Sequence, residues 1–205
     1  MKYKLITQVV ALMVVLVFTV GIWSSGDTVD PEWLRFFSAA VFAATLALNL
    51  WDWLIWRIGL VQRISSVPRD LRGTWEGELT SFWEDPDTGT TPPPKTVYLV
   101  VRQTASTVSV VLYTDEAKSY STLGQVSTKT SLPALEYLYE GRPESRVEDR
   151  SRAHRGTASL DISGLPATKL KGRYWTDRDS KGEIVFTSRD KRLADDYHNA
   201  ESLFS

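Results

Sequence analysis

Two short runs carry side chains suited to ring stacking and anion binding. The first, Tyr174-Trp175-Thr176-Asp177-Arg178, places two aromatic rings, a hydroxyl and a guanidinium at the end of an alternating segment. Aromatic rings stack on flat ring systems such as nucleobases, and an arginine beside a hydroxyl can bind a phosphate. The same run also fits an ordinary strand end with a core tyrosine and solvated turn charges.

The second run holds Ser119 and Ser121, which share one face of a predicted strand. Two hydroxyls in a row suit a phosphate or a ribose, and they equally suit a plain polar strand edge. Further on, Tyr137 and Tyr139 share a face, where paired tyrosines are usually part of a core.

No constellation for catalysis stands out. His154 and His198 are far apart, the chain has no cysteine, and no carboxylate cluster has metal-ligand spacing. A glycine-rich phosphate loop and a nucleophile–base arrangement are also lacking. We therefore expect no catalytic residue, no metal and no cofactor, and hence a binding protein rather than an enzyme.

The elements that must position these residues are short strands. After Ser65, apolar residues alternate with polar ones between Gly, Pro and Asp turns, which predicts an all-β domain and an eight-stranded antiparallel barrel. Gly73-Thr74-Trp75 resembles the Gly-x-Trp start of lipocalin barrels, so we expect Trp75 to plug one end. The expected strands are 72–83, 95–103, 106–114, 119–128, 134–140, 154–163, 168–177 and 182–189.

If the strands run up and down in sequence order, the end of each strand can be assigned to one of the two ends of the barrel. The end with Trp75 collects Gln103, Ala134, Ile162 and Thr168, and polar and aromatic residues concentrate at the opposite end, which is typical of a barrel with a ligand mouth. The residues traced to the mouth are Thr114, Ser119, Ser121, Tyr139, Arg142, His154, Tyr174, Thr176 and Arg178.

The first sixty residues are strongly apolar and predict two transmembrane helices, at about 5–23 and 36–58. Lysine and arginine precede the first span and follow the second, and the connecting loop is acidic, so both termini are expected in the cytosol. The domains predicted are therefore a transmembrane region at 1–64, a barrel at 65–192 and a polar tail at 193–205.

Asn49 and Asp52 lie within the second predicted span, where polar groups are costly and face a partner or the membrane surface. Either Asp52 reaches the headgroups and Asn49 packs on the first span, or both help protomers associate. The formal net charge of the chain is −1, which does not favour binding to DNA or RNA polymers.

The two predicted spans are followed by three segments: Leu71-Arg72-Gly73-Thr74-Trp75-Glu76-Gly77, Gly156-Thr157-Ala158 and Leu170-Lys171-Gly172-Arg173-Tyr174-Trp175-Thr176-Asp177-Arg178. In this combination the chain resembles the family of CBASS antiphage membrane effectors associated with CD-NTase enzymes, and the resemblance covers essentially the whole chain.

The resemblance implies a function in abortive infection. The partner CD-NTase makes a cyclic dinucleotide, the barrel binds it, and the effector forms homo-oligomers that disrupt the bacterial inner membrane. The implied ligand contacts are Ser119, Ser121, Tyr139, Tyr174, Thr176 and Arg178. Two other functions stay open on the residues alone, a lipocalin-like binder of an apolar ligand and a structural membrane protein whose barrel binds other proteins.

Overall fold

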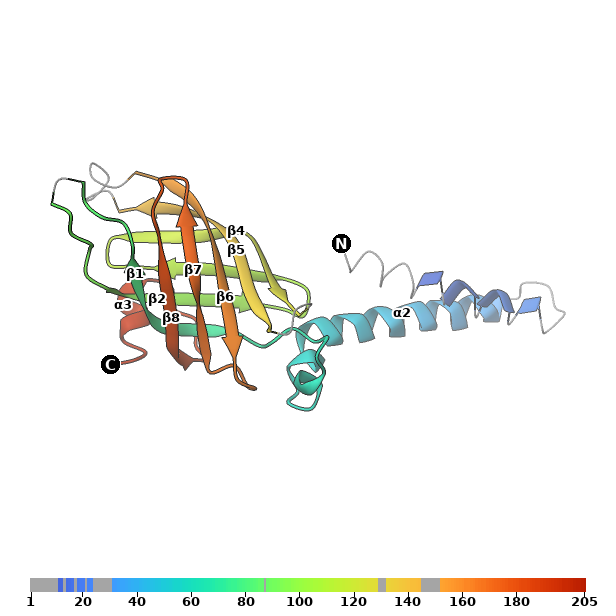
Figure 1. The fold of residues 1–205 in the computed structure, drawn as a ribbon. Helices are drawn as coiled ribbons and strands as arrows, with labels where there is room; N and C mark the ends of the chain where they lie inside the picture. The colour runs from blue at the N-terminus through green and yellow to red at the C-terminus, as the bar shows by residue number, and fades with distance from the viewer. Residues whose placement is uncertain are drawn as a thin grey trace. The chain divides into compact units, whose positions relative to one another are not determined.

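A computed structural model describes residues 11–12, 14–16, 18–20, 22–23, 31–86, 88–128, 132–144 and 152–205 (Figure 1). The chain divides into two compact units, Met1–Ile55 and Trp56–Ser205. The described residues of the first unit are mainly helical, and the second unit is built around a β-barrel.

The first unit contains helix α2, Pro31–Trp53. One helical stretch among the described residues is long and apolar enough to cross a membrane, Phe37–Arg57, which has 21 residues and a mean hydropathy of 1.4 over an 18-residue window. It coincides with the second predicted span. The first predicted span, 5–23, lies partly outside the described residues, and the residues described within it are helical. The prediction of two transmembrane helices is therefore not confirmed, because one candidate is found.

The second unit confirms the eight-stranded antiparallel barrel. Each strand pairs with its neighbours in sequence, and β8 closes onto β1 (Figure 1). Period-two alternation produces this layer because successive side chains point to opposite faces of a strand. The strands are β1 (Gly73–Ser81), β2 (Lys95–Gln103), β3 (Val108–Tyr113), β4 (Ala117–Ser127), β5 (Ala134–Pro143), β6 (His154–Ser163), β7 (Lys169–Thr176) and β8 (Lys181–Asp190).

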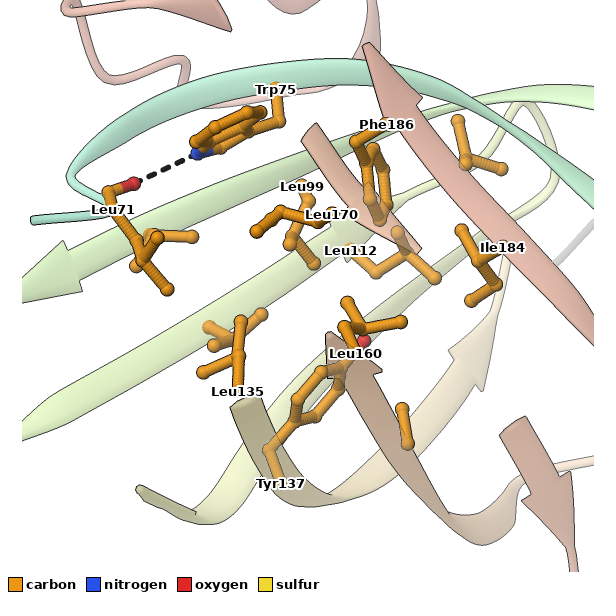
Figure 2. Close-up of a cluster of buried hydrophobic side chains, with 14 of the residues drawn as sticks. Leu71, Trp75, Leu99, Leu112, Leu135, Tyr137, Leu160, Leu170, Ile184 and Phe186 are labelled. Carbon is orange, nitrogen blue, oxygen red and sulfur yellow. Dashed lines mark hydrogen bonds between the residues drawn. The ribbon is translucent and has the colours of Figure 1, made fainter. Parts of the chain in front are cut away.

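Large apolar side chains pack inside the barrel, with Trp75 and Leu71 at one end of the cluster (Figure 2). Trp75, near the start of β1, is fully buried, and its indole Nε1 donates to the carbonyl of Leu71 at 2.8 Å. The guanidinium of Arg189 lies 5.1 Å from the Trp75 ring centroid. We call this the closed end.

The chain enters the closed end through a segment held by buried amides. The side-chain Nε2 of Gln62 donates to the carbonyls of Trp56 at 2.7 Å and Pro68 at 2.9 Å, and its Oε1 accepts from the N–H of Asp70 at 3.0 Å. From β2, Gln103 accepts from the N–H of Leu71 at 2.9 Å. The segment before β1 is therefore part of the barrel unit.

Arg189 completes this attachment. Its Nη1 donates to the carbonyl of Asp70 at 3.0 Å, and its Nε and Nη2 donate to the carbonyl of Arg72 at 3.0 and 2.6 Å. A half-buried guanidinium that bonds two carbonyls while covering an indole fixes the start of β1 in position.

The C-terminal residues pack on the outside of the barrel. Helix α3, Tyr197–Glu201, carries the fully buried Ala200 onto Tyr98 and Val100 of β2. The hydroxyl of Tyr113 donates to the carbonyl of Asp195 at 2.6 Å. Part of the predicted polar tail, 193–205, thus contributes to a small second core.

Replacing Gln62 by leucine should destabilise the barrel. The change removes three hydrogen bonds and leaves two carbonyls and one N–H without partners in a poorly hydrated place. We expect the free energy of unfolding to fall by about 2–4 kcal/mol. Thermal unfolding of the full chain in detergent, followed by tryptophan fluorescence, measures this.

The matched control is Gln125→Leu. Gln125 is exposed on β4 and bonds only the carboxylate of Glu136 at 2.8 Å, so its loss should change the unfolding free energy by less than about 0.5 kcal/mol. Equal effects of the two substitutions would contradict the anchoring role of Gln62.

Candidate ligand-binding site

A cavity of about 170 Å³ lies inside the barrel at the end opposite Trp75. Trp75 pairs with Leu99 near the start of β1, whereas Leu79, which lines the cavity, pairs with Lys95 near the other end of that strand. The lining residues come from the barrel strands and the turns that join them. They are Leu79, Leu112, Thr114, Ala117, Ser119, Tyr137, Tyr139, His154, Tyr174, Thr176, Arg178, Ser180 and Ile184.

Of the six residues predicted to contact a ligand, the structure brings five together around this cavity: Ser119, Tyr139, Tyr174, Thr176 and Arg178. Ser121 is not among the lining residues. Its Oγ accepts from the backbone N–H of Val110 at 2.8 Å, beside an irregularity in the β4–β5 register. The hydroxyl of Ser121 is thus used within the sheet.

Of the eight lining residues that were not predicted ligand contacts, four are polar or aromatic: Thr114, Tyr137, His154 and Ser180. Tyr137 shares a face with Tyr139, and that pattern alone does not separate a core tyrosine from one that lines a cavity. His154 was traced to the mouth without a role. Only the register, which pairs it with Gly141, brings it beside Arg178.

The other singled-out polar residues lie in the first unit. Asn49 is exposed on α2, and its side-chain Nδ2 donates to the carbonyl of Thr45 at 2.8 Å. Asp52 is half-buried on the same helix. Neither lines the cavity.

The polar rim of the cavity is the turn between β7 and β8. The hydroxyls of Thr176 and Ser180 are 2.8 Å apart, and the N–H of Arg178 donates to Thr176 Oγ1 at 3.2 Å. Asp179 takes the left-handed conformation, with φ of 57°, that Asp tolerates in tight turns. The turn therefore presents two hydroxyls and one guanidinium together.

Arg178 and His154 form a pair at the rim, with 3.0 Å between the guanidinium Nη2 and the imidazole Nδ1. Because a guanidinium only donates, Nδ1 must accept in this contact. The carbonyl of Arg152 lies 3.3 Å from the same nitrogen and could be bonded only by a protonated Nδ1. Burial lowers the pKa of His154 below its ordinary value, and the charge of Arg178 lowers it further. The neutral imidazole therefore orients Arg178.

Three rings lie against glycines of a neighbouring strand. A Cβ at Gly141 would come within 2.5 Å of the His154 ring, one at Gly156 within 2.5 Å of Tyr139, and one at Gly182 within 2.6 Å of Tyr174. Glycine has no Cβ, so each ring can settle against the backbone of the barrel wall. We call Tyr139, His154 and Tyr174 the glycine-backed rings.

The tyrosines of the site keep one charge state. Burial raises the pKa of Tyr137, Tyr139 and Tyr174, which keeps their hydroxyls neutral. Among the described residues, no group of three or more His, Cys, Asp and Glu is placed to hold a metal ion. Neutral rings, hydroxyls and one guanidinium suit a planar, anionic ligand.

Comparison with known proteins agrees with this chemistry. Residues 65–188 match the family model described as Cap15, cyclic dinucleotide receptor domain. The chain is also similar to CD-NTase-associated protein 15 of Staphylococcus schleiferi, at 24% identity over 176 residues, which span 86% of this chain and 88% of that relative. The family predicted from the sequence is confirmed, and the chain belongs to the Cap15 cyclic dinucleotide receptor family of CBASS effectors.

Proposed function

We propose that this chain is a CBASS effector whose barrel binds a cyclic dinucleotide and whose helices then disrupt the bacterial inner membrane. The observation that carries the proposal is the cavity at the open end, where glycine-backed rings, hydroxyls and Arg178 meet within the receptor domain. A cyclic dinucleotide has two bases, which suit the rings, and two phosphates, which suit the hydroxyls and Arg178.

The two parts of the ligand fit different parts of the site. Arg178, Thr176 and Ser180 at the rim supply the donors that a phosphate accepts. The interior beneath them is lined by Leu79, Leu112 and Ile184, which suit a base rather than a charge.

The membrane part of the proposal rests on α2 and on the predicted first span. With both termini in the cytosol, the barrel meets a ligand that a partner CD-NTase releases there. Ligand drives assembly only if the assembled state binds it more tightly than the single protomer does. Two spans in one protomer line no pore, so the lipid bilayer would be disrupted by a homo-oligomer.

An apolar ligand, as in a lipocalin-like carrier, is supported less well. The closed end is filled by Trp75, Leu99 and Phe186, and the remaining 170 Å³ is below the roughly 300–1,000 Å³ of common ligand pockets. A lipid chain that copurifies with the barrel, together with indifference to nucleotides, would favour this alternative.

Arg178→Ala should weaken cyclic dinucleotide binding by roughly 10- to 100-fold, because it removes the cation that faces a phosphate. Calorimetry of the full chain in detergent against all cyclic dinucleotides of the four common bases measures the loss. Arg173→Ala is the matched control, since Arg173 is exposed on β7 and does not line the cavity. Equal affinity in both variants would remove Arg178 from the site.

Affinity should rise as the pH falls. Ligand phosphates beside His154 favour its charged form, so binding adds a proton to an imidazole that burial keeps neutral. Between pH values of about 7.5 and 5.5 we expect a gain of roughly three- to tenfold. His154→Gln keeps an acceptor for Arg178 without titrating, and its affinity should be flat. A gain that survives in His154→Gln would contradict the assignment.

Asn49→Ala should separate binding from assembly. If Asn49 helps protomers associate, its loss leaves ligand affinity unchanged and weakens ligand-induced assembly by about 3- to 20-fold, the range of one interhelical hydrogen bond. Crosslinking and dye release from vesicles of bacterial lipid, each with and without ligand, report this step. Thr45→Val, which also removes a polar group from α2, is the control. Unchanged assembly in Asn49→Ala would place that residue outside the interface.

A further inference from the structure

Tyr137 lies deeper in the barrel than the glycine-backed rings. It is two residues before Tyr139 on β5, on the same inward face, and its ring centroid is 6.0 Å from that of Tyr139. The side chain is only 4% exposed, and it borders the cavity. Figure 2 shows it directed toward Leu160 and surrounded by apolar side chains.

The hydroxyl of Tyr137 is hydrogen-bonded to none of the described residues, and it is not one of the fully buried polar atoms that lack a partner, so it is open to the cavity. Tyrosine hydroxyls inside a protein usually find a hydrogen-bond partner. A phenylalanine would fill the same space, so the hydroxyl is explained by a partner within the cavity.

The surroundings decide the chemistry of that partner. Leu79, Leu112 and Ile184 line the cavity with Tyr137, and Arg178 is the one cation among the lining residues. Arg178 belongs to the rim turn, so a phosphate at the depth of Tyr137 would lose its hydration without gaining a counter-charge. A nucleobase loses less hydration free energy than a phosphate, because its faces are apolar and its polar atoms lie along one edge.

The size of the cavity favours a single base. A dry protein cavity of about 150 Å³ holds one benzene molecule, and the cavity here measures about 170 Å³. A whole cyclic dinucleotide is far larger than this volume. One base inside and the phosphates at the rim match both the volume and the placement of polar groups.

We propose that the Tyr137 hydroxyl hydrogen-bonds the edge of one ligand base, which enters the cavity past Tyr139 and Tyr174 while the phosphates stay at Arg178. The proposal deepens the proposed function and rests on it. Burial raises the pKa of Tyr137, so the hydroxyl keeps its proton and acts as a donor to a carbonyl oxygen or ring nitrogen.

The test is Tyr137→Phe in the full chain, purified in detergent. Affinity for the best-binding member of the cyclic dinucleotide panel should fall by about 5- to 100-fold, because a buried base acceptor loses its donor. The thermal midpoint without ligand should stay the same or rise. A lower midpoint with unchanged affinity would mean that Tyr137 is structural and would overturn the proposal.

Tyr98→Phe is the matched control. Tyr98 is equally buried, but it lies outside the barrel lumen against Tyr197 and Phe204, and it does not line the cavity. Its substitution should leave ligand affinity unchanged. A loss of affinity in Tyr98→Phe as large as that in Tyr137→Phe would show a general effect of the substitution and would contradict the assignment.

A ligand lacking one base identifies what Tyr137 contacts. For each of the two abasic analogues of the best-binding ligand, the loss caused by Tyr137→Phe should disappear when the inserted base is the one removed. A loss that persists with both analogues overturns the base contact. Failure of the wild-type chain to bind any panel member would instead refute the proposed function itself.

Discussion

Closure of the sheet by β1–β8 pairing is the constraint on which the remaining structure depends. In an eight-stranded barrel the lumen is just wide enough for side chains. A large inward side chain therefore fills the lumen, and a small one leaves space. At the closed end, Trp75, Leu99 and Phe186 fill it. At the open end, inward Gly141, Gly156 and Gly182 leave room, and a cavity results.

The strands were predictable because alternation depends only on which face a residue occupies. The observed bounds agree with the predicted ones to within a few residues, and up-and-down order was enough to collect five predicted site residues around one cavity. Ser121, which was predicted with them, does not line the cavity, because a register irregularity follows it. Such an irregularity depends on pairing with a neighbour, which a single strand's pattern does not contain.

Other features depend on tertiary contacts and left no local pattern. An inward tyrosine looks the same in sequence whether its hydroxyl is satisfied or faces a cavity, so Tyr137 could not be told from a core residue. The pairing of His154 with Arg178 needed the register of three strands. The hydrogen bonds of Gln62 likewise could not be foreseen, because they depend on how the segment before β1 turns back on itself.

The glycine contacts also determine how the receptor can change its preferred ligand. At Gly141, Gly156 and Gly182 even one added methyl group would meet a ring or backbone atom, so these positions tolerate little change. Exchanging a glycine-backed ring for a smaller side chain adds volume directly, because nothing but backbone lies behind it. In a laboratory selection for altered base preference, we therefore expect accepted substitutions at Tyr139, His154 and Tyr174, and an unchanged wall around them.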